Sequence, residues 1–400
     1  MKKVNILISA FLISAGISAQ SVYDVILQAK ALSSSGKADD AISILSGAMK
    51  NWNDYRLFRE KADNEVVNGD LASAVSDYNA ANKLVEYSGE TGLARVYAIR
   101  GDAAASLSHL ELSMKSRFKK SEKEIMLDPA FGKIENSPDW RSFWKKDWYT
   151  ASDEALSEIE YYVSSGRIIE AGDVYSGMEK ASAGRNDLIY AGALIDEGSG
   201  NNDEAVKSLT SLLASDPKNE KYLRALASAQ AGNSNPAGAS VTYTRLIALE
   251  VPDAGLFLMR AGCYRQTGEY DKAMKDITRY LALYPGNKTA LRMAGKVESA
   301  SGRNLKALEY FSMNLKLHPD DPQCYIDRGD SYFLSKSWDW AAKDYGMSLD
   351  LDPGNPDVWL NRGIALVNEG NTDDACHDFR MSLRYGNKKA TDYISKYCIK

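Results

Sequence analysis

The sequence predicts an all-α protein, an α-α superhelix of about ten helix–turn–helix repeats that ends in a C-terminal capping helix. Two observations lead to this prediction. Alanine recurs every 34 residues along most of the chain, and each 34-residue stretch carries two runs of apolar residues at helical spacing. A period held that long without a shift is typical of stacked repeats. The recurring alanines are Ala171, Ala205, Ala239, Ala273, Ala307, Ala341 and Ala375.

Residues 254–287 illustrate one repeat. Phe257 and Ala261 begin a run of apolar residues at helical spacing, Gly268 interrupts it, and a second run starts at Ala273. This pattern predicts two amphipathic helices joined by a tight turn. Small residues recur at repeat positions 8 and 20, where a larger side chain would push the two helices apart. We therefore expect the recurring alanines to be buried where the helices cross.

These repeats resemble the tetratricopeptide repeat, whose 34-residue period carries small, aromatic and proline residues at fixed positions. The resemblance covers most of the chain and is most specific in the last four units. The residues that carry it, besides those at 254–287, are Gly295, Ala307, Phe311 and Pro319, then Tyr325, Gly329, Tyr332, Ala341, Tyr345 and Pro353, and finally Trp359, Gly363, Ala375 and Phe379. It implies a helical solenoid that binds a protein or peptide.

The period also suggests how the chain is divided. Residues 20–127 are assigned to an N-terminal array of three looser tetratricopeptide units, and residues 152–387 to a seven-unit array. Residues 388–400 are expected to form a helix that covers the exposed apolar face of the last repeat, as the ends of solenoids require.

Between the two arrays, residues 128–151 form an irregular, Trp-rich junction. A serine, a proline and an aspartate at 137–139 are a strong start signal for a helix. That helix is expected to place Trp140, Trp144 and Trp148 on one face. The stripe either packs the joint between the arrays, which would bury a large apolar area, or stands exposed as a platform for a glycan or peptide.

A charge pattern recurs with the period at repeat positions 7 and 23. The paired residues are Arg260 with Asp276, Arg328 with Asp344, Arg362 with Asp378, and Lys61 with Asp77. Where position 7 is Ala294, position 23 is Tyr310, so the charges are present together or absent together. This predicts a direct ion pair, within a unit or between neighbours, whose role is to hold the register of the helices.

The first residues are expected to be a secretory signal peptide, residues 1–19. Lys2 and Lys3 precede a short apolar run, and Ser18-Ala19 offers a small-residue cleavage site. Without that segment the chain carries 47 basic and 54 acidic residues, a net charge of −7. The sequence thus predicts an exported protein, soluble in the periplasm or cell envelope, with no membrane span and no nucleic-acid partner. It leaves the oligomeric state open.

The sequence predicts neither an enzyme nor a metal or cofactor site. The three histidines and four cysteines show no zinc-ligand spacing. Phosphate-binding loops and nucleophile motifs are also missing. All four cysteines fall in predicted helices, where cysteine is often a buried residue, and whether Cys376 and Cys398 form a disulfide is left open.

In tetratricopeptide solenoids the first helix of each unit lines the concave side, so the resemblance implies that repeat positions 2, 5, 9 and 12–13 face a ligand. Basic residues hold these positions in the middle units: Lys221, Arg224, Arg265, Arg292 and Lys296. Acidic residues lie at or next to these positions further on: Asp327, Asp330 and Asp357. A basic patch flanked by acids would suit a peptide with an acidic segment or a free carboxylate, and a solvated face without a fixed partner is the alternative.

The predicted function is therefore a non-enzymatic scaffold or adaptor of the cell envelope that binds a partner segment in the groove. One alternative is a module that captures a carbohydrate or peptide with exposed aromatic residues. The other is a chaperone-like holder of exported chains, which would use apolar groove residues: Leu258, Ile326, Phe333 and Ile364.

Overall fold

The computed structural model describes residues 21–181 and 184–398, so the predicted signal peptide lies outside the described residues. Within these ranges all regular secondary structure is helical, in 23 α-helices and one short 3₁₀ helix. The predicted all-α fold is confirmed. The chain divides into two compact units, one ending at Ser157 and the other starting at Glu158.

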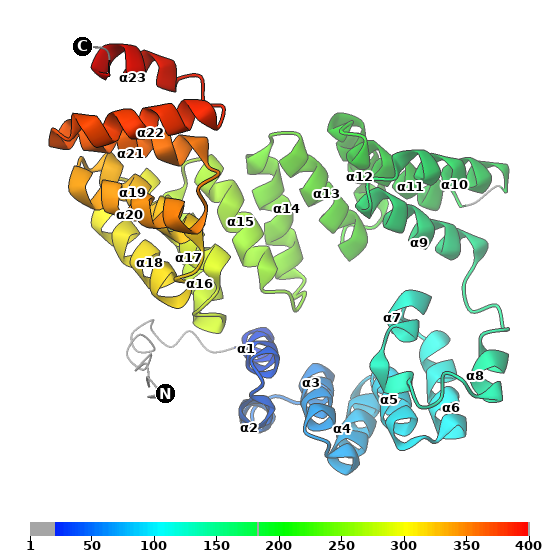
Figure 1. The fold of residues 1–400 in the computed structure, drawn as a ribbon. Coiled ribbons are helices and arrows are strands. Elements are labelled where there is room, and N and C mark those ends of the chain that lie inside the picture. Colours follow the sequence, from blue (N-terminus) through cyan, green and yellow to red (C-terminus); the bar gives the residue numbers. More distant parts are fainter. Residues whose placement is uncertain (1–20, 182–183, 399–400) are drawn as a thin grey trace. The chain divides into compact units, whose positions relative to one another are not determined.

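The first unit begins with three consecutive helical hairpins, followed by shorter helices (Figure 1). The hairpins are α1 (Val22–Ser34) with α2 (Ala38–Ala48), α3 (Tyr55–Val67) with α4 (Leu71–Leu84), and α5 (Glu90–Arg100) with α6 (Ala103–Met114). The short elements are α7 (Glu122–Met126), the 3₁₀ helix η1 (Pro129–Phe131) and α8 (Pro138–Phe143).

The second unit continues the alternation of first and second helices. Helix α9 (Ala151–Ser164) spans the division between the units and is followed by α10 (Ile168–Lys180), α11 (Arg185–Gly198), α12 (Asn202–Ser215), α13 (Glu220–Gly232) and α14 (Pro236–Ala248). The next hairpins are α15 (Gly255–Gln266) with α16 (Tyr270–Leu283), α17 (Lys288–Ala300) with α18 (Asn304–Leu317), α19 (Pro322–Leu334) with α20 (Trp338–Leu351), and α21 (Pro356–Glu369) with α22 (Thr372–Arg384). Helix α23 (Ala390–Tyr397) follows the last hairpin.

Small residues occupy the helix crossings. All seven periodic alanines are fully buried, which confirms the burial predicted for them. Gly363 of α21 shows why size matters here, since a Cβ at this residue would lie 2.6 Å from the ring of Phe379 on α22. The turn after a first helix uses glycine for another reason: Gly268 has a φ of +78°, a left-handed conformation that side chains with a Cβ rarely adopt.

Replacing Ala341 with leucine is expected to destabilise the protein by about 1–3 kcal/mol, because the extra atoms must displace packed neighbours. Ala341 is fully buried in a cluster with Tyr345 and Trp359. Ala282→Leu, at an exposed position of α16, is the matched control and should change stability by no more than about 0.5 kcal/mol. Chemical denaturation of both variants measures the difference, and equal effects would contradict tight packing at Ala341.

The periodic charges form ion pairs within their own hairpins, as the sequence predicts. Each arginine donates two hydrogen bonds of 2.7 Å to its aspartate, in the pairs Arg260–Asp276, Arg328–Asp344 and Arg362–Asp378. Lys61 likewise binds Asp77. The three aspartates paired with arginine are at most 4% exposed, so these pairs link the two helices of a hairpin inside the protein.

The Trp-rich segment differs from the single helix that the sequence predicts. Helix α8 ends at Phe143, so Trp148 does not continue the helical face of Trp140 and Trp144. Instead the indole of Trp148 folds back, stacks on Phe143 at 4.6 Å and donates a 2.8 Å hydrogen bond from Nε1 to the Phe143 carbonyl. The Phe143 carbonyl, which a longer helix would have paired internally, thus accepts hydrogen bonds from the indole and from the Lys146 backbone N–H.

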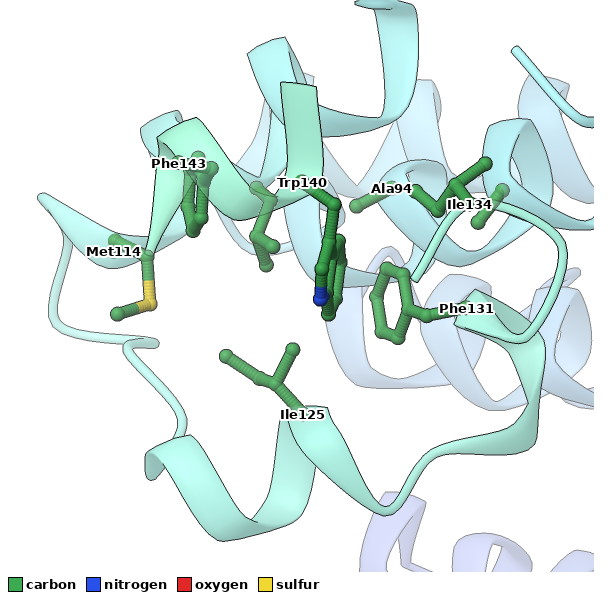
Figure 2. Packing of buried hydrophobic residues seen from close by; sticks show 9 residues of the cluster. Ala94, Met114, Ile125, Phe131, Ile134, Trp140 and Phe143 are labelled. Carbon is green, nitrogen blue, oxygen red and sulfur yellow. The ribbon is translucent and has the colours of Figure 1, made fainter. Parts of the chain in front are cut away.

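The same segment packs against α5 and α6. Trp140 is buried with Phe131 and Ile134 in a cluster that also includes Ala94 of α5 and Met114 of α6 (Figure 2). Trp144 and Trp148 are half-buried against this cluster. The tryptophans therefore form part of a core, and the prediction of an exposed aromatic platform at this segment is not supported.

The C-terminal helix lies on the last hairpin and is tied to it. In α23, Tyr393 and Tyr397 pack against Phe379 of α22, with ring centroids 5.1 and 6.4 Å from it. A disulfide joins Cys376 of α22 to Cys398, which settles the question that the sequence left open. Cys263 and Cys324 are free and buried.

Candidate functional site

The five basic residues predicted to face a ligand lie on the first helices of three consecutive hairpins. Lys221 and Arg224 are on α13, Arg265 is on α15, and Arg292 and Lys296 are on α17. The alternation of hairpins brings these helices into one series, since each first helix packs next to the second helix of the hairpin before it.

These cations differ in their pairing. Arg224 is held between two carboxylates, with ion pairs of 2.9 Å to Glu220 and 3.0 Å to Asp253. Lys221 and Arg265 are exposed and have no ion pair with any residue of the described ranges. Of the five basic residues, Lys221 and Arg265 are therefore the ones whose charge is available to a partner.

Arg292 and Lys296 share a carboxylate from the next first helix. Asp327 of α19 lies 2.7 Å from Arg292 Nε and 3.6 Å from Lys296 Nζ, and it is only 4% exposed. Asp327, which the sequence places after the basic residues, thus lies among them and offsets part of their positive charge. The pair also means that Arg292 and Lys296 stabilise a buried carboxylate.

A pocket of about 280 Å³ opens beside this ion pair. Its walls come from the first helices α15, α17 and α19 and from one residue of α18. They are formed by Arg265, Lys296, Ser299, Ala300, Phe311, Asp327, Asp330, Ser331 and Leu334. The structure thus brings Arg265 and Lys296 together, whereas Lys221, Arg224 and Arg292 do not line the pocket.

Two polar residues of the pocket have unusual surroundings. Asp330 Oδ1 accepts a 2.8 Å hydrogen bond from the Tyr345 hydroxyl, and burial raises the pKa of this carboxyl, with the charge of Asp327 adding to the effect. Ser331 is 3% exposed, and its Oγ has no hydrogen-bond partner among the described residues. Sequence reasoning missed Ser331, because a serine in a helix carries no signal of its own.

The raised pKa of Asp330 predicts a pH dependence of stability. Its folded pKa lies above the unfolded value of about 3.9, so the folded state binds more protons between the two values. The stability that Asp330 contributes is therefore complete below the unfolded pKa and falls as the pH rises through the folded pKa. Asp330→Asn, which keeps an acceptor for Tyr345, should lose this part of the pH profile. Identical profiles for the two proteins in urea denaturation would contradict the assignment.

In the first unit, the corresponding first-helix face is occupied by the protein's own chain. Phe118 packs edge-on against Tyr55 of α3, with centroids 6.0 Å apart, and Arg59 lies over its ring at 5.6 Å. Asp128, before η1, makes a 2.8 Å ion pair with Arg95 of α5. Since Arg59 holds repeat position 5, the segment after α6 lies where a ligand is expected in a tetratricopeptide unit.

Other features of the described residues bear on function. Leu258, Ile326, Phe333 and Ile364 are half-buried and packed against hydrophobic clusters. Across the described ranges, no helix has both the length and the apolar character needed to span a bilayer. No group of three or more His, Cys, Asp or Glu side chains in these ranges is arranged to hold a metal ion.

Residues 224–288 match the family model of the tetratricopeptide repeat. No curated protein matches the chain significantly. Among solved structures, a tetratricopeptide repeat protein from Parabacteroides merdae is 22% identical, with 62% of this chain and 98% of that chain covered and a TM-score of 0.47. A chain of the APC/C hetero-tetramer Cut9–Hcn1 is 13% identical, with 94% of this chain and 89% of that chain covered and a TM-score of 0.46. YrrB, described as a tetratricopeptide protein with an unusual peptide-binding site, is 16% identical, with 48% and 99% covered and a TM-score of 0.38.

The matched residues run from α13 to the first residue of α17, and helical hairpins with the same buried alanines continue on both sides of them. The 34-residue period and the hairpins on both sides of this segment agree with the family match, which covers residues 224–288.

Proposed function

We propose that the mature protein is a scaffold or adaptor of the cell envelope that binds a segment of a partner protein along the first helices α13, α15 and α17. The observation that carries this proposal is the pair of exposed cations on this face, Lys221 and Arg265, that have no ion pair within the described residues. A partner segment with acidic side chains or a carboxylate would supply the missing counter-charges.

The proposal includes a non-enzymatic role. Tetratricopeptide repeats are generally scaffolds, and helical hairpins make up most of the described chain. An envelope location is supported by the charged, apolar and small-residue pattern of residues 1–19. The chaperone-like alternative loses support because its four apolar residues pack against the core.

The double variant Lys221→Glu, Arg265→Glu is expected to weaken partner capture at least about tenfold, or about 1.4 kcal/mol, because it reverses the charge of the proposed face. Capture from the envelope fraction by the mature protein, followed by quantification of each retained protein, measures the loss. Capture by the unaltered protein should also weaken with added salt, since exposed charges are screened over about 8–10 Å at physiological ionic strength.

A matched control changes the net charge equally on second helices. Lys316 lies in the last turn of α18 and Arg384 ends α22, and both are exposed without an ion pair in the described ranges. Lys316→Glu, Arg384→Glu should capture the partner normally. Arg292 and Lys296 are left unchanged in this test, because replacing them would strip a buried carboxylate of its counterions. Equal capture by both double variants would place the binding surface elsewhere.

A further inference from the structure

The charges around the pocket on α15, α17 and α19 are balanced, and this bears on what the pocket can hold. Two cations, Arg265 and Lys296, and two acids, Asp327 and Asp330, line it. Asp327 is engaged by Arg292 at 2.7 Å and by Lys296 at 3.6 Å. Arg265 and Asp330 therefore remain as one cation and one anion without an ion pair among the described residues.

A small ligand with a single charge, held inside the pocket, fits this wall poorly. An acidic group beside Arg265 would also face the carboxylates of Asp327 and Asp330, and an ammonium group beside Asp330 would also face Arg265 and Lys296. Like charges held close together in a partly buried site repel each other. A ligand that carries both charges gives Arg265 and Asp330 each an opposite charge, and these two attractions offset the repulsions that a single charge would meet.

The uncharged part of the wall adds two further requirements. Ser331 lacks a hydrogen-bond partner although it is 97% buried, so a polar atom of a ligand next to it would satisfy its hydroxyl. Ala300, Phe311 and Leu334 provide apolar surface, and Leu334 stands 70% exposed. The volume of about 280 Å³ lies just below the range of about 300–1,000 Å³ that is usual for ligand pockets, so the ligand must be small.

From these features we infer that the pocket binds a small α-amino acid with an apolar side chain. The carboxylate would pair with the Arg265 guanidinium, which is suited to planar bidentate contacts. The ammonium group would pair with Asp330, within reach of Asp327, and the side chain would lie against Phe311 and Leu334. This site goes beyond the proposed partner surface, because Lys221 on α13 takes no part in it.

Three probes of nearly the same shape test the inference on the mature protein by isothermal titration calorimetry. Leucine carries both charges, N-acetylleucine only the carboxylate, and leucinamide only the ammonium group. We expect leucine to bind about tenfold more tightly than either of the others. The inference is overturned if N-acetylleucine or leucinamide binds as tightly as leucine, or if leucine shows no saturable binding.

Variants assign the two charges to their residues. Arg265→Ala should reduce leucine binding to the level of leucinamide, and Asp330→Asn should reduce it to the level of N-acetylleucine. Lys221→Ala, on the neighbouring helix α13, is the matched control and should bind leucine like the unaltered protein. If Asp330→Asn does not fold, Ser331→Ala takes its place, and unchanged leucine affinity in that variant would count against the site.

The test is separable from that of the proposed function. Lys221→Glu alone should weaken capture of the partner while leaving leucine binding intact. If Lys221→Glu captures the partner as well as the unaltered protein does, the proposed function has failed. If the unaltered protein captures the partner but does not bind leucine, the inference about the pocket has failed.

Discussion

Replacing Arg328 with alanine is expected to destabilise the second unit by about 3–5 kcal/mol, because the substitution leaves a buried carboxylate without its counterion. Arg328 donates two hydrogen bonds of 2.7 Å to Asp344, which is 4% exposed. Urea denaturation followed by circular dichroism measures the loss. Hydrogen exchange should show the largest change in α19 and α20.

Another hairpin of the same chain shows which residues could replace the ion pair and restore stability. In the hairpin of α17 and α18, the two positions of the ion pair are occupied by Ala294 and Tyr310. The double variant Arg328→Ala, Asp344→Tyr copies that arrangement and should recover most of the lost stability, because no unpaired charge remains inside. The exposed-site control Arg384→Ala should cost no more than about 0.5 kcal/mol. If Arg328→Ala is as stable as this control, the ion pair contributes nothing to stability.

Removing the disulfide is the second substitution with a large expected effect. Cys376 and Cys398 are 22 residues apart, and closing a loop of this length stabilises the folded state by about 3 kcal/mol in the chain-entropy view. Cys398→Ser should therefore lower stability by up to that amount and loosen α23. Hydrogen exchange should increase in α23 and in the face of α22 beneath it.

Reduction with dithiothreitol provides the control. It should destabilise the unaltered protein as much as the Cys398→Ser substitution does, and it should have no further effect on that variant, since Cys263 and Cys324 are already free thiols. If the unaltered protein is insensitive to reduction while the serine variant is destabilised, the loss comes from packing at Cys398 and the disulfide contributes little.

The features that repeat were the ones that the sequence could predict. The burial of Ala341 and the pairing of Arg328 with Asp344 follow from a period that states the same physical requirement several times. The end of α8 could not be predicted in this way. At that end the Trp148 indole, from beyond the helix, donates a hydrogen bond to the Phe143 carbonyl, and this contact occurs once and not with the period.

The candidate site shows the same limit. The basic residues of the first helices could be identified from their repeat positions, but their mutual contacts could not. Asp327 pairs with Arg292 and Lys296 across two successive hairpins, and the geometry of that crossing turns an expected cationic patch into a pocket with mixed charge. Ser331 of α19 lies beside these charged residues because the helices that line the pocket converge there.

The segment after α6, which covers the first-helix face of the first unit, would compete with a free peptide for that face. Phe118 and Asp128 are joined to α6 of the same unit by a short stretch of chain, so they face α3 and α5 at an effective concentration of the order of millimolar. A free peptide at micromolar concentration would need about a thousandfold higher intrinsic affinity to displace them. The two units therefore differ in how readily an outside chain gains access, since Lys221 and Arg265 of the second unit have no such internal competitor among the described residues.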